Sequence, residues 1–354
     1  MLYTTSVRGI FMPMKNTPNI QMICDQLGLS KATVSKALNG YPQVNKSTRE
    51  AVQRYAEEIG YRVDKPAAAQ LSTAVRRIGM PGRAPGSERT DFSGDYQVMA
   101  GFRDEALRHG MEIILLPSIK TPVQIELSLE ALIAPYQLDG ILISGLRTDD
   151  PYLTQLQSIQ IPAVLWDLKV APNPLVGTVC YDSLRGAQMA VEHLLSLGHR
   201  RIAIFNGHRY AQVCYERLDG YRLALINAGI TPDPALELWG DFTEAGAEEA
   251  AELFIQKGVT AVFCACDTTA IGLMRQLKGK GKRVPRDLSV VGYDDSPLSS
   301  AVSPALTTVS QDFYRIGQVA CGMMNVLLQG LPLHCETVLP RLVVRDSTGP
   351  APVI

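Results

Sequence analysis

The chain has 354 residues, of which 46% are hydrophobic and 19% charged, so a wholly disordered protein is excluded. No apolar run approaches the roughly 20 residues that cross a bilayer. The first residues include Thr4, Ser6 and Arg8, where a secretory signal would be apolar. We therefore expect a cytoplasmic protein without a membrane partner.

The net charge of −1 conceals an uneven distribution. Residues 1–80 contain 11 Lys and Arg against 5 Asp and Glu, a net charge of +6. The remaining residues contain 34 − 11 = 23 basic and 35 − 5 = 30 acidic residues, a net charge of −7. A basic N-terminal region on an acidic body indicates a polyanionic partner at one end of the chain.

Residues 1–17 show no periodicity and contain Met12 and Met14, so we interpret them as a disordered tail or an artefact of start-codon choice. Three short helices are then predicted, at 19–26, 31–38 and 46–59. Ser30 is expected to cap the second helix and Asn45 the third. A tight glycine-containing turn between two short helices is typical of a helix-turn-helix, although the pattern also fits an ordinary helical hairpin with solvated lysines.

In a helix-turn-helix, the second helix enters the major groove with its first turn near the base edges. Lys31 is suited to guanine and Ala32 to an apolar contact such as a thymine methyl. The hydroxyls of Thr33 and Ser35 suit phosphate oxygens, and Lys36 can reach a base or a phosphate.

Residues 63–77 are a connector whose helix is expected to form only against a packing partner. From residue 78 apolar runs alternate with amphipathic helices, which predicts parallel sheets covered on both faces and arranged in two lobes. The predicted strands are 111–117, 140–144, 163–167, 177–182, 201–207, 261–266 and 288–294. The predicted helices lie near 96–109, 123–134, 183–197, 215–228, 244–257, 268–279 and 312–329. Residues 78–96 lack the apolar strand expected at the start of such a fold.

Seven cysteines are scattered along the chain without a CxxC pair. Buried, reduced thiols are expected rather than a zinc site or a disulfide framework. No glycine cluster ends in the Gly-Lys-Ser/Thr of a phosphate loop, and the adjacent pairs at 149–150 and 294–295 are poorly placed as acid and base. We expect no metal, no cofactor and no enzymatic activity.

Several long motifs resemble those of the lactose-repressor/galactose-repressor (LacI/GalR) transcription factors. They are GLSKATVSKALNG (28–40), EHLLSLGHRRIAIFNG (192–207), ERLDGYRLALINAGI (216–230), VPRDLSVVGYDDSPLSSAVSPALTTVSQD (284–312) and LPRLVVRDST (339–348). The resemblance implies an α/β protein with an N-terminal helix-turn-helix headpiece and a two-lobed, periplasmic-binding-protein-like core of doubly wound parallel sheets.

The resemblance also implies boundaries: a headpiece at 18–62, a hinge helix at 63–77 and an effector-binding and dimerisation core at 78–354. The first lobe would comprise about 78–177 and 310–337, and the second about 178–309 and 338–349. A homodimer would bind a pseudo-palindromic operator in double-stranded DNA, with Leu71 wedged into the minor groove. DNA contacts are implied at Ile20, Ser30, Lys31, Ala32, Thr33, Ser35, Lys36, Asn39, Tyr61 and Leu71.

By the same resemblance, a small-molecule effector, expected to be a carbohydrate, binds in the interlobe cleft. Arg217 would grip hydroxyls or a carboxylate, and Asp294 would accept hydrogen bonds at the end of a strand. Asp182 and Phe242 match a polar and an aromatic pocket position, and Cys266 stands where the family commonly has Asn. Without the resemblance, Arg217 is a surface arginine and Phe242 a core residue.

Two other functions remain as alternatives at this point. The body resembles periplasmic sugar-binding proteins, so a solute-binding protein without DNA function is the second hypothesis. An enzyme of sugar metabolism is the third. The C-terminal STGPAPVI carries no leucine heptads that would build a tetramer, which favours a dimer.

Overall fold

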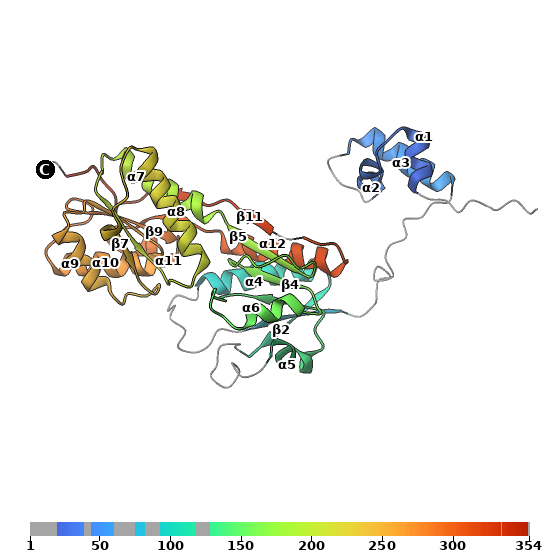
Figure 1. Ribbon diagram of the computed structural model, residues 1–354, viewed down its shortest axis with the longest axis horizontal. Helices are drawn as coiled ribbons and strands as arrows, with labels where there is room; N and C mark the ends of the chain where they lie inside the picture. Colours follow the sequence, from blue (N-terminus) through green and yellow to red (C-terminus); the bar gives the residue numbers. More distant parts are fainter. Residues whose placement is uncertain are drawn as a thin grey trace, which may run out of the picture. The chain divides into compact units, whose positions relative to one another are not determined.

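The computed structural model describes residues 20–38, 44–59, 75–81, 93–117, 128–333 and 335–352. The chain divides into two compact units, residues 1–71 and 72–354 (Figure 1). The predictions for the tail 1–17 and for Asn39, Tyr61 and Leu71 lie outside the described residues.

The N-terminal unit consists of α1 (Ile20–Leu27), α2 (Lys31–Leu38) and α3 (Lys46–Glu58). Both predicted caps are confirmed: the Thr33 amide donates to Ser30 Oγ at 3.1 Å, and the Thr48 amide donates to Asn45 Oδ1 at 2.8 Å. Apolar positions at helical spacing form a small core, comprising Ile23, Cys24, Val34, Ala37, Val44, Val52 and Ala56.

The second unit contains, in its described parts, two six-stranded sheets. The first sheet has the order β11-β5-β4-β3-β1-β2 and is wholly parallel. Its strands are β1 (Arg76–Pro81), β2 (Met111–Leu116), β3 (Gly140–Ile143), β4 (Ala163–Trp166), β5 (Val176–Tyr181) and β11 (Cys335–Val338).

The second sheet has the order β12-β10-β9-β8-β6-β7, and only its edge strand β12 is antiparallel. Its strands are β6 (Ile202–Asn206), β7 (Glu237–Trp239), β8 (Ala261–Cys264), β9 (Ser289–Asp294), β10 (Thr307–Ser310) and β12 (Arg341–Val343). The predicted doubly wound α/β class is confirmed.

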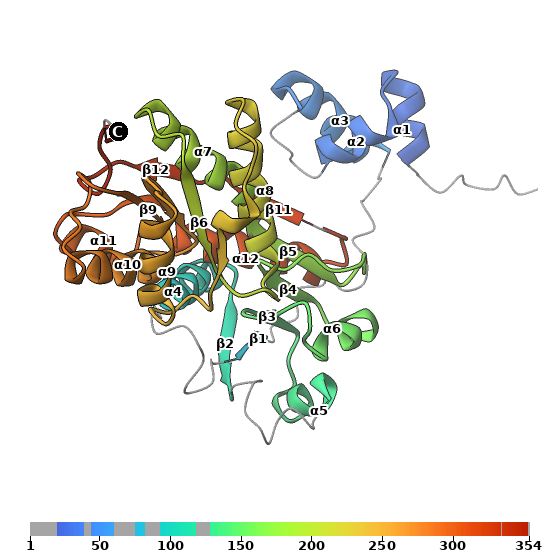
Figure 2. The ribbon, with the colours of Figure 1, turned by 60° about the vertical axis from the view of Figure 1, so that its left-hand side comes forward.

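Helices cover both faces of each sheet (Figures 1 and 2). Around the first sheet they are α4 (Ser93–Arg108) and α12 (Phe313–Leu328) on one face, with α5 (Leu129–Ile133) and α6 (Tyr152–Gln155) on the other. Around the second sheet they are α7 (Ser183–Ser196) and α8 (Gln212–Asn227) on one face, with α9 (Ala247–Gln256) and α10 (Asp267–Gly279) on the other. We call each sheet with its helices a lobe. No helix in the described parts of the chain is long and apolar enough to span a membrane.

The close packing of α4 on α12 depends on two glycines. A Cβ at Gly101 would collide with the backbone oxygen of Tyr314, and one at Gly317 would collide with the backbone oxygen of Val98. The helices therefore approach each other closely enough for backbone contact, which fixes α12 on the first sheet.

The chain crosses between the lobes three times: from β5 into α7, from β10 into α12, and from β11 into β12. The first crossing falls later than the expected boundary at about 177, because β5 stays in the first sheet as far as Tyr181. The Asp182 amide donates to the Val338 carbonyl at 3.1 Å, so the first and third crossings lie side by side.

The sequence missed five strands, and each had a weak apolar signal. The expectation that 78–96 lacks a strand is wrong, since β1 covers Arg76–Pro81; it begins with two arginines and buries only its middle residues. Strand β10 was missed because Thr307 and Thr308 are buried with hydrogen-bonded hydroxyls. The short strands β7, β11 and β12 are largely not buried. Of the helix predicted at 123–134, the described part is α5.

Candidate functional site

The second helix of the N-terminal unit presents a polar, basic surface. Lys31 and Lys36 on α2 are exposed and have no ion pair with any described residue. Ser30 Oγ lies 2.8 Å from Thr33 Oγ1, so both hydroxyls gather at the N-terminus of α2. Two uncompensated cations along one short helix, with backbone N–H groups at its start, suit a polyanionic partner.

The remaining predicted DNA-contact residues are placed as follows. Ser35 lies on α2 between the two lysines and is partly exposed, and Ala32 belongs to the same helix. Ile20 begins α1 and packs, half-buried, against the core of the unit.

In the second unit, polar side chains from both lobes gather at the carboxyl ends of the strands, where ligands bind in sheets of this class. We call six of these residues the interlobe cluster: Trp166, Asp167, Tyr181, Arg217, Asp294 and Gln311. The first three end or follow β4 and β5 of the first lobe, and the others belong to the second lobe.

Arg217 interacts electrostatically with Asp167 of the first lobe and Asp294 of the second, and it is only 2% exposed. Its Nη1 donates to the Ala265 carbonyl at 2.6 Å, and its Cζ lies 3.8 Å from the centre of the Tyr293 ring. Burial, the largest single effect, lowers the pKa of Arg217, but Tyr293, Asp294 and Asp167 together raise that pKa above its usual value. The guanidinium is therefore a buried cation, and the prediction of a surface arginine in the absence of the resemblance is wrong.

Asp294 ends β9 and faces the same region. Its Oδ1 accepts a 2.5 Å hydrogen bond from Gln311 Nε2, so the ends of β9 and β10 are joined by their side chains. On the side of the first lobe, the Phe313 ring lies 5.6 Å from that of Trp166 and 6.4 Å from that of Tyr181. Desolvation, followed by nearby carboxylates that include Asp167 and Asp294, raises the pKa of Tyr181.

Four polar atoms of the cluster are buried without a hydrogen-bond partner among the described residues: Trp166 Nε1, Tyr181 Oη, Arg217 Nε and Gln311 Oε1. Such atoms are rare in folded proteins, and each costs about 1–3 kcal/mol of stability. Three of them are donors and one is an acceptor, which is a pattern that a hydroxyl-rich molecule can satisfy.

Strained backbone also concentrates here. Among the described residues, Asp167, Phe242, Asp294 and Asp295 are four of the five non-glycine residues with positive φ, at 59°, 67°, 116° and 58°. Backbone strain of this kind occurs preferentially at functional sites.

The other predicted effector residues have structural contacts of their own. Asp182 caps α7, accepting from the Arg185 amide at 2.9 Å. Cys266 is 1% exposed and caps α10, with its Sγ 3.4 Å from the Thr269 amide and 3.6 Å from the Phe242 carbonyl. The structure thus brings Phe242 and Cys266 together but gives Cys266 the role of a helix cap.

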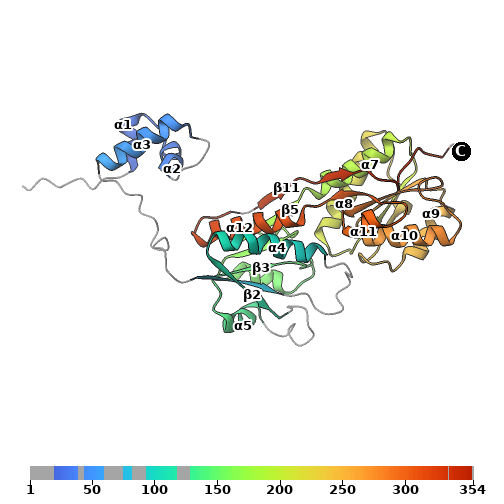
Figure 3. The same ribbon diagram turned by 180° about the vertical axis from the view of Figure 1, so that it is seen from behind.

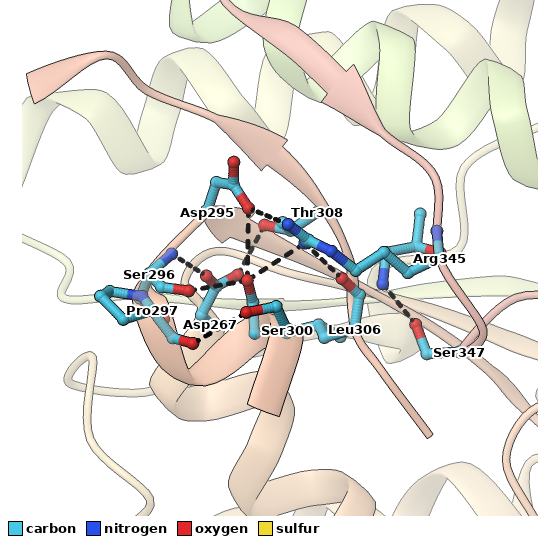
Figure 4. A network of polar contacts seen from close by, with 11 residues as sticks. Asp267, Asp295, Ser296, Pro297, Ser300, Leu306, Thr308, Arg345 and Ser347 are labelled. Carbon is cyan, nitrogen blue, oxygen red and sulfur yellow. Dashed lines mark hydrogen bonds and ion pairs between the residues drawn. The ribbon is translucent and has the colours of Figure 1, made fainter. Parts of the chain in front are cut away.

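A second polar network supports the site from within the second lobe (Figure 4). Asp267, 1% exposed, accepts from the Ser296 amide at 2.6 Å and from Thr308 Oγ1 at 2.5 Å. Burial, and then the charge of Asp294, raise the pKa of Asp267 to about 8. Sequence reasoning missed Asp267 as a network residue, although its position at the start of α10, shortly after β8, was a usable signal.

Asp295 belongs to the same network. Its Oδ1 accepts from Arg345 Nη2 at 2.6 Å, and Ser299 Oγ donates to it at 3.2 Å. The network fixes the loop after β9, and with it the strained backbone of Asp294.

Direct contacts join the two lobes outside the cluster. The Thr148 amide donates to the Tyr210 carbonyl at 2.9 Å, and Arg147 Nη1 lies 3.3 Å from His208 Nε2. Lys169 Nζ lies 2.8 Å from Glu216 Oε1. These contacts join the lobes in the arrangement that the structure shows.

Two family models match the chain. Residues 19–64 match the model of bacterial regulatory proteins of the lacI family, and residues 191–348 match a periplasmic binding protein-like domain. The HTH-type transcriptional regulator CelR of Thermobifida fusca is 31% identical over 95% of this chain and 100% of its own length. The chain belongs to the LacI family.

Solved structures agree with this assignment. A structure described as a transcriptional regulator CelR–cellobiose complex matches with a TM-score of 0.70 and 29% identity, covering 94% of this chain and 100% of that one. The lac repressor dimer bound to operator and an anti-inducer matches with a TM-score of 0.67 and 26% identity over the same shares. This LacI-family chain is therefore a DNA-binding transcriptional regulator.

Proposed function

We propose that this chain represses transcription as a homodimer that binds a pseudo-palindromic operator through α2 and is switched by a small molecule at the interlobe cluster. The observation that carries the proposal is the set of four buried, unpartnered polar atoms contributed by both lobes. A ligand that bonds to them would stabilise one arrangement of the lobes over another, as a switch requires.

The chemistry of the cluster favours a polyhydroxylated molecule. The indole N–H of Trp166, the phenol of Tyr181 and the Nε–H of Arg217 can donate, while the carboxylate of Asp294 can accept. The rings of Trp166 and Phe313 pack against each other in the apolar core beside these groups, so an apolar wall adjoins the polar atoms. The cellobiose of one structural relative and the operator-bound dimer of another support the same proposal for this chain. We assign it no catalytic activity and a cytoplasmic location.

The DNA-binding part is tested by selecting bound fragments from a random duplex pool with the purified full-length protein at physiological salt. Enrichment of a pseudo-palindrome is expected. The absence of any enriched sequence, with only salt-sensitive background binding, would favour the alternative of a solute-binding protein without DNA function.

The role of α2 is tested on the selected operator with Lys36→Ala. We expect weaker binding and a salt slope reduced by about one, because one phosphate-neutralising cation is lost. The control is Lys282→Ala, which removes the same charge from an exposed loop of the second unit. If the dependence of affinity on salt is unchanged in Lys36→Ala, Lys36 does not contact the DNA.

The effector is sought by measuring thermal unfolding of the protein with mono- and disaccharides and related metabolites. A ligand at 100 times its dissociation constant stabilises the folded state by about 2.7 kcal/mol, which is readily detected. A hit that raises the Tm of the wild type but not of Arg217→Met would place it at the cluster.

A further inference from the structure

The seven cysteines all fall within the described residues, and six are buried as expected. Cys335 is exposed, so the expectation of buried thiols is wrong for this residue. Its Sγ lies 3.8 Å from the Sγ of Cys180, which is 3% exposed and belongs to the neighbouring strand. An exposed thiol in van der Waals contact with a buried one is typical of redox-sensitive pairs. In such a pair, the exposed thiol is oxidised first, and the second thiol then forms a disulfide with it.

The register of the two strands produces this contact. Strand β11 lies beside β5 (Figures 1 and 3). The two strands are parallel, with Cys335 paired to Thr178 and Thr337 paired to Cys180. These four side chains share one face of the sheet, since side chains two residues apart on a strand point the same way. The two sulfurs belong to a diagonal pair of residues on neighbouring strands and therefore face each other.

We propose that Cys180 and Cys335 form a reversible disulfide when the protein meets a hydroperoxide, and that this bond alters the lobe arrangement on which operator binding depends. The disulfide follows from the geometry of β5 and β11 alone, whereas its effect on operator binding rests on the proposed function.

The reaction proceeds in two balanced steps. The thiolate of Cys335 attacks the terminal oxygen of the hydroperoxide, the O–O bond breaks, and the alkoxide or hydroxide leaves with a proton, so that Cys335 becomes a sulfenic acid. The sulfur of Cys180 then attacks the sulfur of Cys335, and the S–O bond breaks. Hydroxide leaves with the Cys180 proton as water. A dithiol reverses the bond by exchange.

A cation, Lys169, lies near the two thiols. Lys169 is close enough to both thiols for its charge to lower the pKa of Cys180, although burial is the dominant effect and keeps that pKa high, at about 12. Cys180 is thus unsuited to react first, and the exposed Cys335 is the thiol that meets the oxidant. Lys169 also forms the ion pair with Glu216 of α8, so chemistry at the thiols acts directly on a contact between the lobes.

The bond requires movement, and β11 is the strand that can move. An S–S bond is about 2.05 Å long, so the sulfurs must approach by nearly 2 Å. Strand β11 is an edge strand that, among the described strands, pairs with β5 alone. It leads through Val338 into the third crossing, and Val338 accepts from the Asp182 amide of the first crossing. Closing the disulfide therefore displaces one crossing segment against another.

The experiment treats the reduced full-length protein with hydrogen peroxide, blocks the remaining thiols and maps the unreduced peptides by mass spectrometry. A cross-linked peptide joining Cys180 to Cys335 is expected in the wild type. It should vanish after dithiothreitol and be absent from Cys335→Ser and Cys180→Ala. Oxidation of Cys335 to sulfinic acid without the cross-link would overturn the proposal.

Operator binding is measured on the same samples. Oxidation should lower the operator affinity of the wild type by about fivefold or more, since fivefold is the lower end of the allosteric effects that one site usually exerts on another. Dithiothreitol should restore the affinity. Cys335→Ser keeps the other six cysteines, including Cys24 of the DNA-binding unit, so a response that survives in this variant would assign the effect to one of them and refute the switch. Failure to select an operator would refute the proposed function but leave the peptide map readable.

Discussion

The two lobes share one architecture but differ in how the polar groups at their strand ends are satisfied. In the second lobe, Asp294 is bonded to Gln311, and Asp267 to Ser296 and Thr308. In the first lobe, Trp166 Nε1 and Tyr181 Oη are buried without a hydrogen-bond partner among the described residues. The second lobe thus holds its carboxylates in fixed positions, but it also contributes two buried atoms without a partner among the described residues, Arg217 Nε and Gln311 Oε1.

This difference has an energetic consequence. A ligand contacting the second lobe exploits geometry that is already fixed, so it loses little free energy in ordering the site. A ligand that bonds to the unpaired groups, which both lobes contribute, relieves the cost of leaving them unpaired. The binding energy from these groups is therefore specific to the liganded arrangement, which would allow it to drive a change of state.

The largest effect is expected at Asp267, as a function of pH. Its folded-state pKa of about 8 lies above the unfolded value, so its contribution to stability is present below about pH 4 and is lost as pH rises through 8. Between about pH 4 and pH 8, the unfolding free energy of the wild type should therefore fall by roughly 5 kcal/mol relative to that of Asp267→Asn. Denaturant unfolding at several pH values measures it. A constant difference would show that Asp267 is ionised throughout.

A smaller loss is expected at Arg345, whose side chain is 21% exposed and pairs with Asp295, 17% exposed. Arg345→Ala should cost about 3 kcal/mol, since it leaves a mostly buried carboxylate unpaired. Arg341→Ala, on exposed β12, should stay within about 0.5 kcal/mol of the wild type. Equal losses of stability in the two variants would show that the network does not stabilise the loop after β9.

The smallest effects compare two tyrosines directly. Tyr221 in the second lobe donates to the Ile202 carbonyl at 2.8 Å, so Tyr221→Phe should cost about 1 kcal/mol. Tyr181→Phe in the first lobe should cost close to nothing without effector and should weaken effector binding. If Tyr181→Phe destabilises the ligand-free protein as much as Tyr221→Phe does, the two lobes do not differ in the way described.

The sequence predicted the elements whose signals are local. The caps Ser30 and Asn45 and the helix α2 follow from short-range patterns, and all are found. The strongly apolar strands were also found, because a continuous buried run has few other interpretations.

The features that were missed depend on distant partners. Strand β10 is buried because Thr307 and Thr308 bond to Thr348 and Asp267, which no local pattern reveals. The burial of Arg217 against Tyr293 and the orphaned atom of Tyr181 likewise arise only once the strands of both sheets are assembled. Cys266 was chosen by analogy of position, and its contacts as a helix cap come from the local backbone.

The central claim is that ligand binding at the interlobe cluster is transmitted to the DNA-binding helix. The most direct measurement is operator affinity with and without the metabolite found by thermal shift, in the wild type and in Arg217→Met. The account predicts that the metabolite changes wild-type affinity and leaves that of Arg217→Met unchanged, while both proteins bind the operator equally without it. A variant that responds to the metabolite as the wild type does would contradict the account.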